Sequence, residues 1–554
     1  MSGEGWLQVP IGPQARRWQT ISPARNVLAV ARTVTTAGRL LDLLPLFQAD
    51  RRVQFLFTVG SGSAFDDGVT DFLREVQART VSWEQAVDTP FDLAVSASAN
   101  GDLHRLKAPL LLVPHGAGHN RLLGSADGRR AGVSGLARRQ LVREGRVIPA
   151  AIALSHQEQL ARLARECPEA VPRAVVTGDP VFDRIVANAG RRDHYRRALG
   201  VARHRKLVLL SSTWGEHSLL GANSDLVARL VAELPFDEYQ VLLVAHPNVW
   251  YGHGGLQVRL WLGDAREAGL MLMPPRRGWQ AALLAADVIV GDHGSVTFYG
   301  AALGRPVLLA SSGREAEELD PGSPTAALCR VLPRLDPRRG LRRQLETVIA
   351  DPRTHEEVTS RTLAMPGRAE SLLRGLAYRL MDLPERGHSP VSAPLAEPWA
   401  ERDEVLAFSV ETEVQGSSVS LRRFPFAPGP DRDDQDDRVR EVHLVVDARV
   451  LDRRLLENAA IIVRDDTEPR WAEETLRRYP GCHLAAEIVD TGLVHLTRRD
   501  GQRLEVSAPD RPPDAWCLPS AVYGWLTSGH EPRDITIHLG GQHLRINITP
   551  PRPF

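Results

Sequence analysis

The segment Gly291–Leu309 (GDHGSVTFYGAALGRPVLL) holds the residues best suited to bind a phosphate. A buried strand is expected to end at Gly291, and a helix is expected to begin near Ser295 after a short polar turn. Gly294 permits a close backbone approach, and the free amides at a helix start attract an anion together with the positive end of the helix dipole. The alternative, in which Asp292 or Ser295 only caps the helix, stays open. The candidates from this turn are Asp292, His293, Gly294, Ser295, Val296 and Thr297.

Polar side chains follow four further apolar runs. The segments are Val113–Asn120 (VPHGAGHN), Val175–Ile185 (VVTGDPVFDRI), Leu209–Gly221 (LLSSTWGEHSLLG) and Ala245–Pro247 (AHP). Open α/β sheets bind ligands beyond the carboxyl ends of their strands, so these side chains are expected to face a cleft. Histidines that only hydrogen-bond within their turns, and a tryptophan that only packs between domains, remain alternatives. These segments supply the candidates His115, Gly178, Asp179, Thr213, Trp214 and His246.

Two series of short apolar runs must position these residues. The first series lies at 26–32, 53–60, 91–98, 108–116, 151–155 and 173–180, and the second at 206–215, 239–247, 270–275, 286–292 and 305–311. Runs of strand length that are apolar throughout are typical of parallel strands covered on both faces. Helical stretches such as Ser224–Leu234 separate them. We therefore predict an α/β chain with two Rossmann-like lobes facing each other across a cleft.

The composition changes after the second series. Residues 383–400 carry four prolines and few apolar residues, which indicates a linker. Beyond it, alternating patterns predict strands at 404–414, 440–450, 492–499, 503–509, 534–541 and 543–550, with one clear helix (EPRWAEETLRRYP) among them. They predict a β-rich α+β accessory domain, with a core helix in the segment Trp516–Pro532 and an exposed acidic loop at Pro430–Arg438. The predicted domains are 1–185, the first lobe, on the acceptor side; 186–382, the second lobe, on the nucleotide side; the linker 383–400; and the accessory domain 401–554.

Composition narrows the function classes. The 554 residues include 68 basic and 68 acidic side chains, and this zero net charge argues against a general polyanion or nucleic-acid binder. The four cysteines are far apart and form no CxxC pair, so neither a zinc site nor a disulfide framework is expected. No signal peptide and no transmembrane run is expected either, which favours a cytoplasmic location.

The order and spacing of these motifs resemble the CDP-glycerol glycerophosphotransferase family and, more distantly, UDP-N-acetylglucosamine 2-epimerases. The resemblance covers roughly residues 26–375 and implies the GT-B fold. The His-Gly-Thr-Pro turn of the family corresponds to His115–Gly118, its Gly-Asn-Pro-Arg-Asn-Asp turn to Gly178–Asp183, and its Thr-Trp-Arg to Thr213–Gly215. Its His-Pro corresponds to His246–Pro247, and its Asp-Tyr-Ser-Ser-Val stretch, which ends in Arg-Pro-Val, to Asp292–Val296 and Arg305–Val307. Three departures stand out: Ala117-Gly118 replaces Thr-Pro, Gly215 replaces Arg, and Tyr299 replaces an Asp.

The resemblance implies a nucleotide-diphosphate-dependent transferase. It would move a glycerophosphate or glycosyl group from a CDP- or UDP-linked donor to a hydroxyl acceptor. His115 would be the general base, since a neutral imidazole accepts a proton at neutral pH, and His119 is a weaker candidate. The amides of Ser295, Val296 and Thr297 would hold the donor phosphate. Further contacts to the diphosphate or the nucleotide would come from Thr213, Trp214, His246 and His293. Arg276 and Arg277, which follow the apolar run 270–275, are additional phosphate candidates, with a solvated pair of arginines as the alternative.

No cofactor and no metal is expected, because GT-B transferases generally stabilise the leaving diphosphate with helix amides and side chains. A catalytically silent GT-B scaffold that binds a nucleotide or a protein partner, and a sugar-nucleotide epimerase, are the alternatives. For residues 401–554, partner recognition, self-association and acceptor binding stay open.

Overall fold

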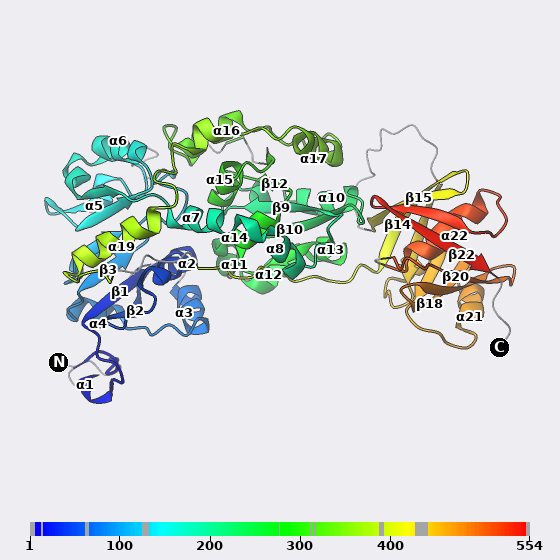
Figure 1. Cartoon of the computed structure of the whole chain (residues 1–554), viewed down its shortest axis with the longest axis horizontal. Helices are drawn as coiled ribbons and strands as arrows, with labels where there is room; N and C mark the ends of the chain where they lie inside the picture. The colour runs from blue at the N-terminus through cyan, green and yellow to red at the C-terminus, as the bar shows by residue number, and fades with distance from the viewer. Residues whose placement is uncertain are drawn as a thin grey trace.

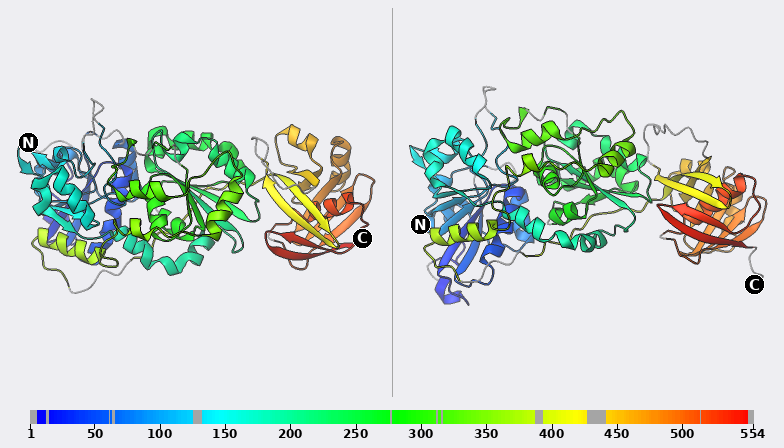
Figure 2. Two further views of the ribbon diagram at one scale, coloured as in Figure 1. Left: turned by 90° about the horizontal axis from the view of Figure 1, so that it is seen from above. Right: turned by 45° about the horizontal axis from the view of Figure 1, so that its top comes forward.

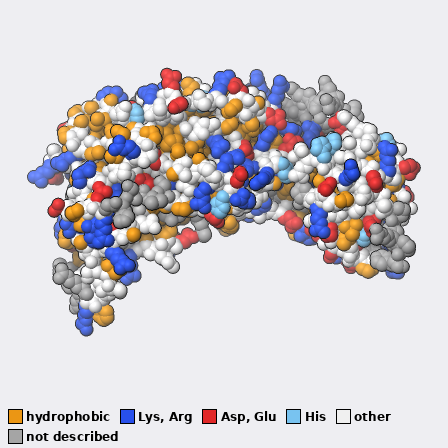
Figure 3. Space-filling view, viewed as in Figure 1, with side chains coloured by type: hydrophobic (Ala, Val, Ile, Leu, Met, Phe, Trp, Pro, Cys, Tyr) orange, Lys and Arg blue, Asp and Glu red, His pale blue; other side chains and the backbone are white. Residues whose placement is uncertain are grey.

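The computed structural model describes residues 6–12, 15–60, 62, 66–124, 132–275, 278–310, 313–314, 317–386, 393–426, 441–512 and 514–549. They form three bodies in a row: two α/β lobes and a closed β-barrel (Figure 1). The space-filling view shows an arch with basic and acidic side chains interspersed over the visible face (Figure 3). Arg276, Arg277 and the acidic segment 430–438 lie outside the described residues.

The first lobe is built on a parallel sheet with the strand order β2-β1-β3-β4-β7-β8. Its strands are β1 (Arg25–Ala31), β2 (Val53–Val59), β3 (Leu93–Ser96), β4 (Leu110–Leu112), β7 (Ala151–Leu154) and β8 (Ala174–Val176). Alternate residues of β1 pack on opposite faces: Val27 and Ala29 enter the cluster of α2 (Val34–Leu43), while Leu28 and Val30 pack with α4 (Trp83–Asp88). Burial on both faces explains why these runs are apolar throughout, and the first predicted series is confirmed.

The second lobe repeats this plan with the parallel strand order β11-β10-β9-β12-β13. Its strands are β9 (Lys206–Ser212), β10 (Tyr239–Ala245), β11 (Met271–Met273), β12 (Val288–Gly291) and β13 (Val307–Leu309). The second predicted series is therefore confirmed, as are the helices α10 (Leu226–Glu233) and α15 (Ser295–Ala302). The strand order reverses between β9 and its neighbour β12, and ligands of open α/β sheets bind at such a switch point. Figure 2 shows helices around both faces of this sheet.

The chain crosses from one lobe to the other more than once. It leaves the first lobe through α7 (Pro180–Ala187) and returns with α19 (Ala369–Leu380), which packs on the first lobe beside β1 and β3 (Figure 1). Tyr378 of α19 stacks on Phe47 with 5.7 Å between ring centroids. The Asp183 carboxylate of α7 accepts the amides of Gly367 and Ala369 at 2.9 and 2.8 Å, which fixes the start of the returning helix. The sequence pattern did not predict this return.

The accessory domain is a closed barrel with the strand order β14-β15-β21-β22-β20-β19-β18-β17-β16 (Figure 2). The strands are β14 (Ala407–Gln415), β15 (Ser418–Pro425), β16 (Glu441–Asp447), β17 (Ile461–Arg464), β18 (Leu484–Asp490), β19 (Leu493–Arg498), β20 (Arg503–Ser507), β21 (Ile535–Leu539) and β22 (Gln542–Thr549). The predicted β-rich α+β class is confirmed. The strands β16, β17 and β18 pair in parallel, so crossover helices join them: α20 (Arg453–Asn458) and the predicted helix α21 (Trp471–Arg478). The predicted core helix is α22 (Cys517–Thr527), whose Trp525 is fully buried.

Sequence analysis missed β15, β17 and β18. Two arginines, Arg422 and Arg423, interrupt the apolar pattern of β15, and β17 has only four residues. Such short or interrupted runs give a weak periodic signal.

A docking segment, residues 393–403, joins the barrel to the second lobe and contains the described end of the predicted linker. Glu401 exchanges both backbone hydrogen bonds with Leu272 of β11, at 3.0 and 2.8 Å. The Arg259 guanidinium holds the Glu401 carboxylate with two hydrogen bonds of 2.8 and 2.6 Å. This part of the chain is therefore joined to the sheet edge by one antiparallel β-bridge.

A buried ion cluster fixes the barrel on the second lobe. The Arg423 side chain of β15 is 1% exposed and donates to both carboxylate oxygens of Asp237 at 2.9 and 2.6 Å. It also donates to Asp514 at 2.5 Å, and its backbone carbonyl accepts the amide of Phe236 at 2.7 Å. A guanidinium buried among two carboxylates is satisfied only in this docked arrangement.

Within the described part of the chain, no helix combines the length and the apolar character that crossing a membrane requires.

The substitution Arg423→Met is expected to lower the free energy of unfolding by about 3–5 kcal/mol, because it leaves the buried Asp237 carboxylate without its cation and also removes the partner of the part-exposed Asp514. The matched control is Arg453→Met on the barrel surface, where the arginine side chain is 78% exposed and its ion pair with Glu457 contributes about 0–1 kcal/mol. Urea unfolding followed by tryptophan fluorescence measures both. Equal losses in the two variants would contradict the role of the cluster.

Candidate functional site

A cavity of about 540 Å³ lies between the two lobes, at the carboxyl ends of their strands. It has walls from both lobes and from the docking segment, which contributes Ala393, Pro394, Leu395 and Ala396. Eight of the predicted site residues line it: His115, Thr213, Trp214, His246, His293, Gly294, Ser295 and Val296. Gly178, Asp179, Asp292 and Thr297 are not among its lining residues, and they shape the surrounding structure instead.

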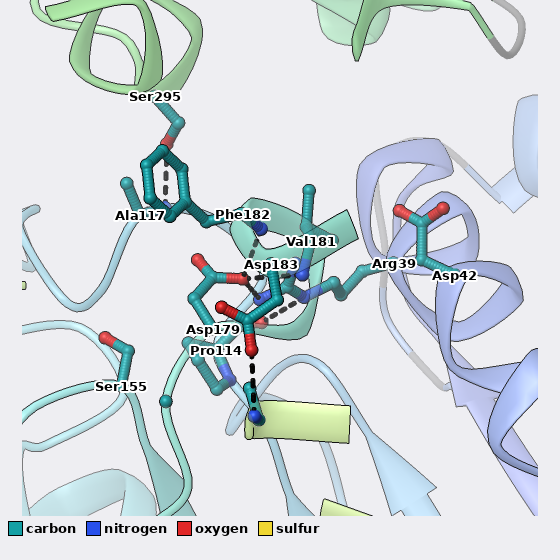
Figure 4. A network of polar contacts seen from close by, with 12 residues as sticks. Arg39, Asp42, Pro114, Ala117, Ser155, Asp179, Val181, Phe182, Asp183 and Ser295 are labelled. Atoms are coloured by element: carbon teal, nitrogen blue, oxygen red, sulfur yellow. Dashed lines mark hydrogen bonds and ion pairs between the residues drawn. The ribbon is translucent and has the colours of Figure 1, made fainter. Parts of the chain in front are cut away.

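The start of α15 has the geometry of an anion site. Gly294 is the residue before the helix, with φ −76° and ψ 163°, and no side chain caps the first turn. The Ser295 hydroxyl does not cap the helix; it accepts the backbone amide of Ala117 from the first lobe at 3.2 Å (Figure 4). Uncapped amides at a helix start carry partial positive charge. They remain available to a phosphate.

Asp292 holds this turn from behind. It is fully buried, and one carboxylate oxygen accepts the amides of Thr213 and Leu219 at 2.7 and 2.9 Å. The other oxygen accepts the amide of Gly294 at 3.0 Å. Burial raises the pKa of Asp292, while His293 and these amides oppose that rise. Asp292 therefore joins the ends of β9 and β12 and takes no direct part in the cavity wall.

His293 and two residues missed by sequence analysis, Arg121 and Glu318, form a polar network beside the cavity. The His293 Nε2 atom lies 3.3 Å from the Glu318 carboxylate, and its buried Nδ1 has no hydrogen-bond partner among the described residues. Arg121 of the first lobe contacts Glu318 and lies 4.2 Å above the centroid of the Trp214 ring. Burial tends to raise the pKa of Glu318, but the hydrogen bond from His293 and the charge of Arg121 lower it to about 2. Trp214 is thus covered on one face by a guanidinium.

His115 follows β4 and opens onto the cavity. Desolvation by the surrounding protein lowers the pKa of the imidazole, and the charges of Arg39 and Arg121 lower it further. A hydrogen bond to the backbone of Ala97 acts in the opposite direction and orients the ring. His115 is therefore a neutral imidazole at neutral pH, as a general base must be.

His246 connects the lobes. Its Nδ1 accepts the amide of Asn248 at 3.1 Å and so caps α11 (Pro247–His253), while its Nε2 lies 3.2 Å from the hydroxyl of Thr35 on α2. Because Nδ1 accepts a hydrogen bond, the proton of the neutral ring is on Nε2, which donates to Thr35. Burial, reinforced by His115 and Arg121, lowers the pKa of His246 to about 3. Both nitrogens are engaged, which favours the alternative of a capping histidine.

A buried cluster around Asp179 lies behind the cavity, where the lobes meet (Figure 4). One Asp179 oxygen caps α7 by accepting the amide of Val181 at 2.9 Å and also accepts Arg39 of α2 at 3.0 Å. The other accepts the hydroxyl of Tyr299 on α15 at 2.5 Å. Burial and the nearby Asp179 charge raise the pKa of Tyr299, so the hydroxyl remains a donor. Tyr299, which stands where the family has an Asp, is thus part of the contact between the lobes. Arg39 was missed, although a lone arginine in the apolar stretch 34–47 is a signal for such a buried pair.

The other departures have backbone reasons. Gly118 has φ +81°, which proline cannot adopt because its ring fixes φ near −65°. Gly215 has φ +99°, a conformation in which an arginine would be strained. A proline at 118 would therefore not fit this backbone, and an arginine at 215 would be strained in it.

Residues 151–318 match the family described as CDP-Glycerol:Poly(glycerophosphate) glycerophosphotransferase. The family resemblance predicted from the sequence is confirmed over this segment. The match includes the Asp179 turn and the start of α15. It begins at residue 151 and therefore does not include His115. The match supports a transferase of the glycerophosphotransferase type, and it does not identify the donor or the acceptor.

Three solved structures are similar to part of this chain. A variant of the wall teichoic acid polymerase TagF is 14% identical with a TM-score of 0.45, covering 65% of this chain and 90% of that one. The UDP-GlcNAc 2-epimerase from Neisseria meningitidis is 13% identical with a TM-score of 0.38, covering 64% and 100%. MnaA from S. aureus, solved with UDP, is 12% identical with a TM-score of 0.37, covering 65% and 97%. A comparison with curated proteins found no match.

In the portion of the chain that the structure describes, no group of three or more His, Cys, Asp or Glu side chains is placed to hold a metal ion.

Gly178→Ala is expected to destabilise the chain. The residue has φ +83°, and an added Cβ would lie 2.6 Å from the carbonyl oxygen of Ala364. The left-handed backbone alone costs about 1–2 kcal/mol, and the contact adds to it. The matched control, Gly304→Ala, has φ +69° and nothing within 4 Å, so it should show the backbone cost alone. Thermal unfolding of both variants measures the difference, and equal losses would refute the close approach.

Glu318→Gln is expected to lower stability at pH 6 by about 1–2 kcal/mol and progressively less as the solution is acidified. Because folding lowers the pKa of Glu318, its ionised form stabilises the folded chain above the ordinary pKa of a glutamate. This contribution is lost as the pH falls towards about 2. Urea titrations at several pH values between 6 and 3 test the convergence of variant and wild type, with the exposed Glu356→Gln as control. A difference that stays constant over this range would argue against the ion pair.

Proposed function

We propose that this chain is a nucleotide-diphosphate-dependent transferase that moves a glycerophosphate or glycosyl group from a CDP- or UDP-linked donor to a hydroxyl acceptor. One observation carries the proposal: a single cavity is lined by His115 from the first lobe and by the uncapped start of α15 from the second. A general base and an anion site facing one space are what the transfer of an activated phosphoryl or glycosyl group requires.

The donor diphosphate fits at the start of α15. The amides of Ser295, Val296 and Thr297 supply hydrogen bonds to the phosphate oxygens, and His293 lies beside them in the cavity wall. Arg121 adds positive charge from the first lobe. These groups stabilise the negative charge that builds on the leaving nucleotide, a task they perform without rearranging.

His115 activates the acceptor. It takes the proton of the acceptor hydroxyl as the oxygen attacks the β-phosphorus or the anomeric carbon of the donor. The new bond to oxygen forms while the bond to the leaving nucleotide breaks, and CMP leaves in glycerophosphate transfer or UDP in glycosyl transfer. The lowered pKa of His115 keeps its lone pair free for this proton at neutral pH.

A silent nucleotide-binding scaffold is the second candidate. One contact favours it: the first-lobe turn lies so close to α15 that a Cβ added to Gly116 would be 2.5 Å from the Ser295 hydroxyl. A donor in this arrangement shares the start of α15 with protein atoms. Binding and turnover, measured separately, distinguish the two candidates.

Ser295→Pro is expected to weaken binding of CDP, CDP-glycerol, UDP or UDP-sugars by about 10- to 100-fold in calorimetry, because it deletes one amide that faces the phosphate. Proline is tolerated at the first helical position, and the extended Gly294 can precede it. The matched variant Ser295→Ala removes only the hydroxyl and should weaken binding less.

His115→Ala is expected to leave nucleotide binding nearly unchanged and to lower the rate of nucleotide release from the donor by about 10²–10⁴-fold. A wild-type chain that binds none of these nucleotides would overturn the transferase proposal. Binding that depends on Ser295 without any turnover would favour the scaffold.

A further inference from the structure

His119 presents an unsatisfied hydrogen-bond acceptor in the first-lobe wall of the cavity. The side chain is 8% exposed and lines the cavity. Its Nδ1 lies 3.1 Å from the carbonyl oxygen of Ser134, so this nitrogen must carry the proton and donate it. The other nitrogen, Nε2, is therefore an unprotonated acceptor, and it has no partner among the described residues.

The neighbours of His119 hold the ring in this state. Burial, followed by the charges of Arg162 and His115, lowers the pKa of His119 to about 3, so the ring is neutral at physiological pH. Gly135 lies against it with φ +83°, and a Cβ there would be 2.3 Å from Nδ1. The ring thus has little freedom to turn and satisfy Nε2 elsewhere.

Asn120 presents a second unpaired acceptor in the wall of the same cavity. Its Nδ2 donates to the carbonyl oxygen of Ala117 at 2.7 Å, which fixes the orientation of the amide group. The Oδ1 atom is buried without a partner among the described residues, and the side chain lines the same cavity. The backbone of Asn120 is held across the lobes by the amide of Asp320 at 2.8 Å.

The two unpaired acceptors, His119 Nε2 and Asn120 Oδ1, indicate what kind of ligand would bind here. Buried polar groups in native proteins are almost always hydrogen-bonded, so an unpaired pair in a cavity wall points to a ligand with hydrogen-bond donors. An anion would face two lone pairs, and a cation would face the charges of Arg121 and Arg162. A neutral hydroxyl group, which donates an O–H···N or O–H···O hydrogen bond and carries no charge, avoids both problems.

We propose that His119 Nε2 and Asn120 Oδ1 form a hydroxyl-binding subsite for a polyol or sugar acceptor beside the general base. The inference deepens the proposed function, because it places the neutral, hydroxyl-bearing part of the acceptor on the first-lobe wall. The phosphate of the donor stays at α15. The subsite lets the chain distinguish an acceptor with adjacent hydroxyls from an analogue that lacks one.

The test compares the full chain with His119→Asn and Asn120→Leu. Asparagine places its Nδ2 where histidine has Nδ1, so His119→Asn keeps the donor to Ser134 and removes the acceptor at Nε2. His104→Asn, at an exposed position of the same lobe, is the matched control. Saturation-transfer NMR measures binding of glycerol, ribitol and glucose, each beside a deoxy analogue, and thermal unfolding reports whether each variant is folded.

We expect the wild-type chain and His104→Asn to bind at least one of these polyols about tenfold more tightly than its deoxy analogue, and both site variants to reduce this preference to within about twofold. A preference that survives in the folded His119→Asn variant, or a wild-type chain that binds no polyol, would overturn the subsite. Release of CMP or UDP from the donor is recorded separately. Its absence would count against the transferase and not against the subsite, since polyol binding needs no turnover.

Discussion

The relative position of the two lobes depends on one buried carboxylate, that of Asp179. It joins three helices from both lobes: it caps α7, accepts the guanidinium of Arg39 on α2, and accepts the hydroxyl of Tyr299 on α15. Charges this deeply buried are tolerated only when every lone pair and donor has a partner in good geometry. Moving any one of the helices would leave a charge or a hydroxyl unpaired in the interior. The cluster therefore selects one arrangement, and α15, whose start faces the cavity, belongs to it.

The contacts that bring the lobes together at the cavity use the residues of the candidate site. His246 caps α11 in the second lobe and donates to Thr35 in the first, and the Ser295 hydroxyl accepts the amide of Ala117. Arg121 reaches from the first lobe to Glu318, the partner of His293. A donor phosphate at α15 would compete for some of these groups. Lobe contact and donor binding are consequently coupled through the same atoms.

The sheets could be predicted from the sequence because parallel strands buried on both faces leave a strong local signal, and all eleven runs became strands. The turns that follow them were also predictable, since ligand sites of open sheets lie there. Arg39, Arg121 and Glu318 were not, because their partners are remote: Arg39 and Asp179 are separated by 140 positions, and Arg121 and Glu318 by 197. A charged residue on a helix or loop has the same local pattern whether it is solvated or paired.

The docking segment shows why composition alone does not define a linker. Its prolines suggested a spacer, yet Leu395 is buried in the core of the second lobe, and the Asn188 amide side chain bonds to the backbone of Ala393 and Leu395 at 3.3 and 3.4 Å. Proline lowers the entropy of the unfolded chain, so it suits an extended segment that must lie in one place. The same segment forms part of the cavity wall and, a few residues later, the β-bridge at Glu401 that precedes the barrel. Together with the buried Arg423 cluster, this continuity makes the barrel a fixed part of the second lobe, whose position is tied to the shape of the cavity.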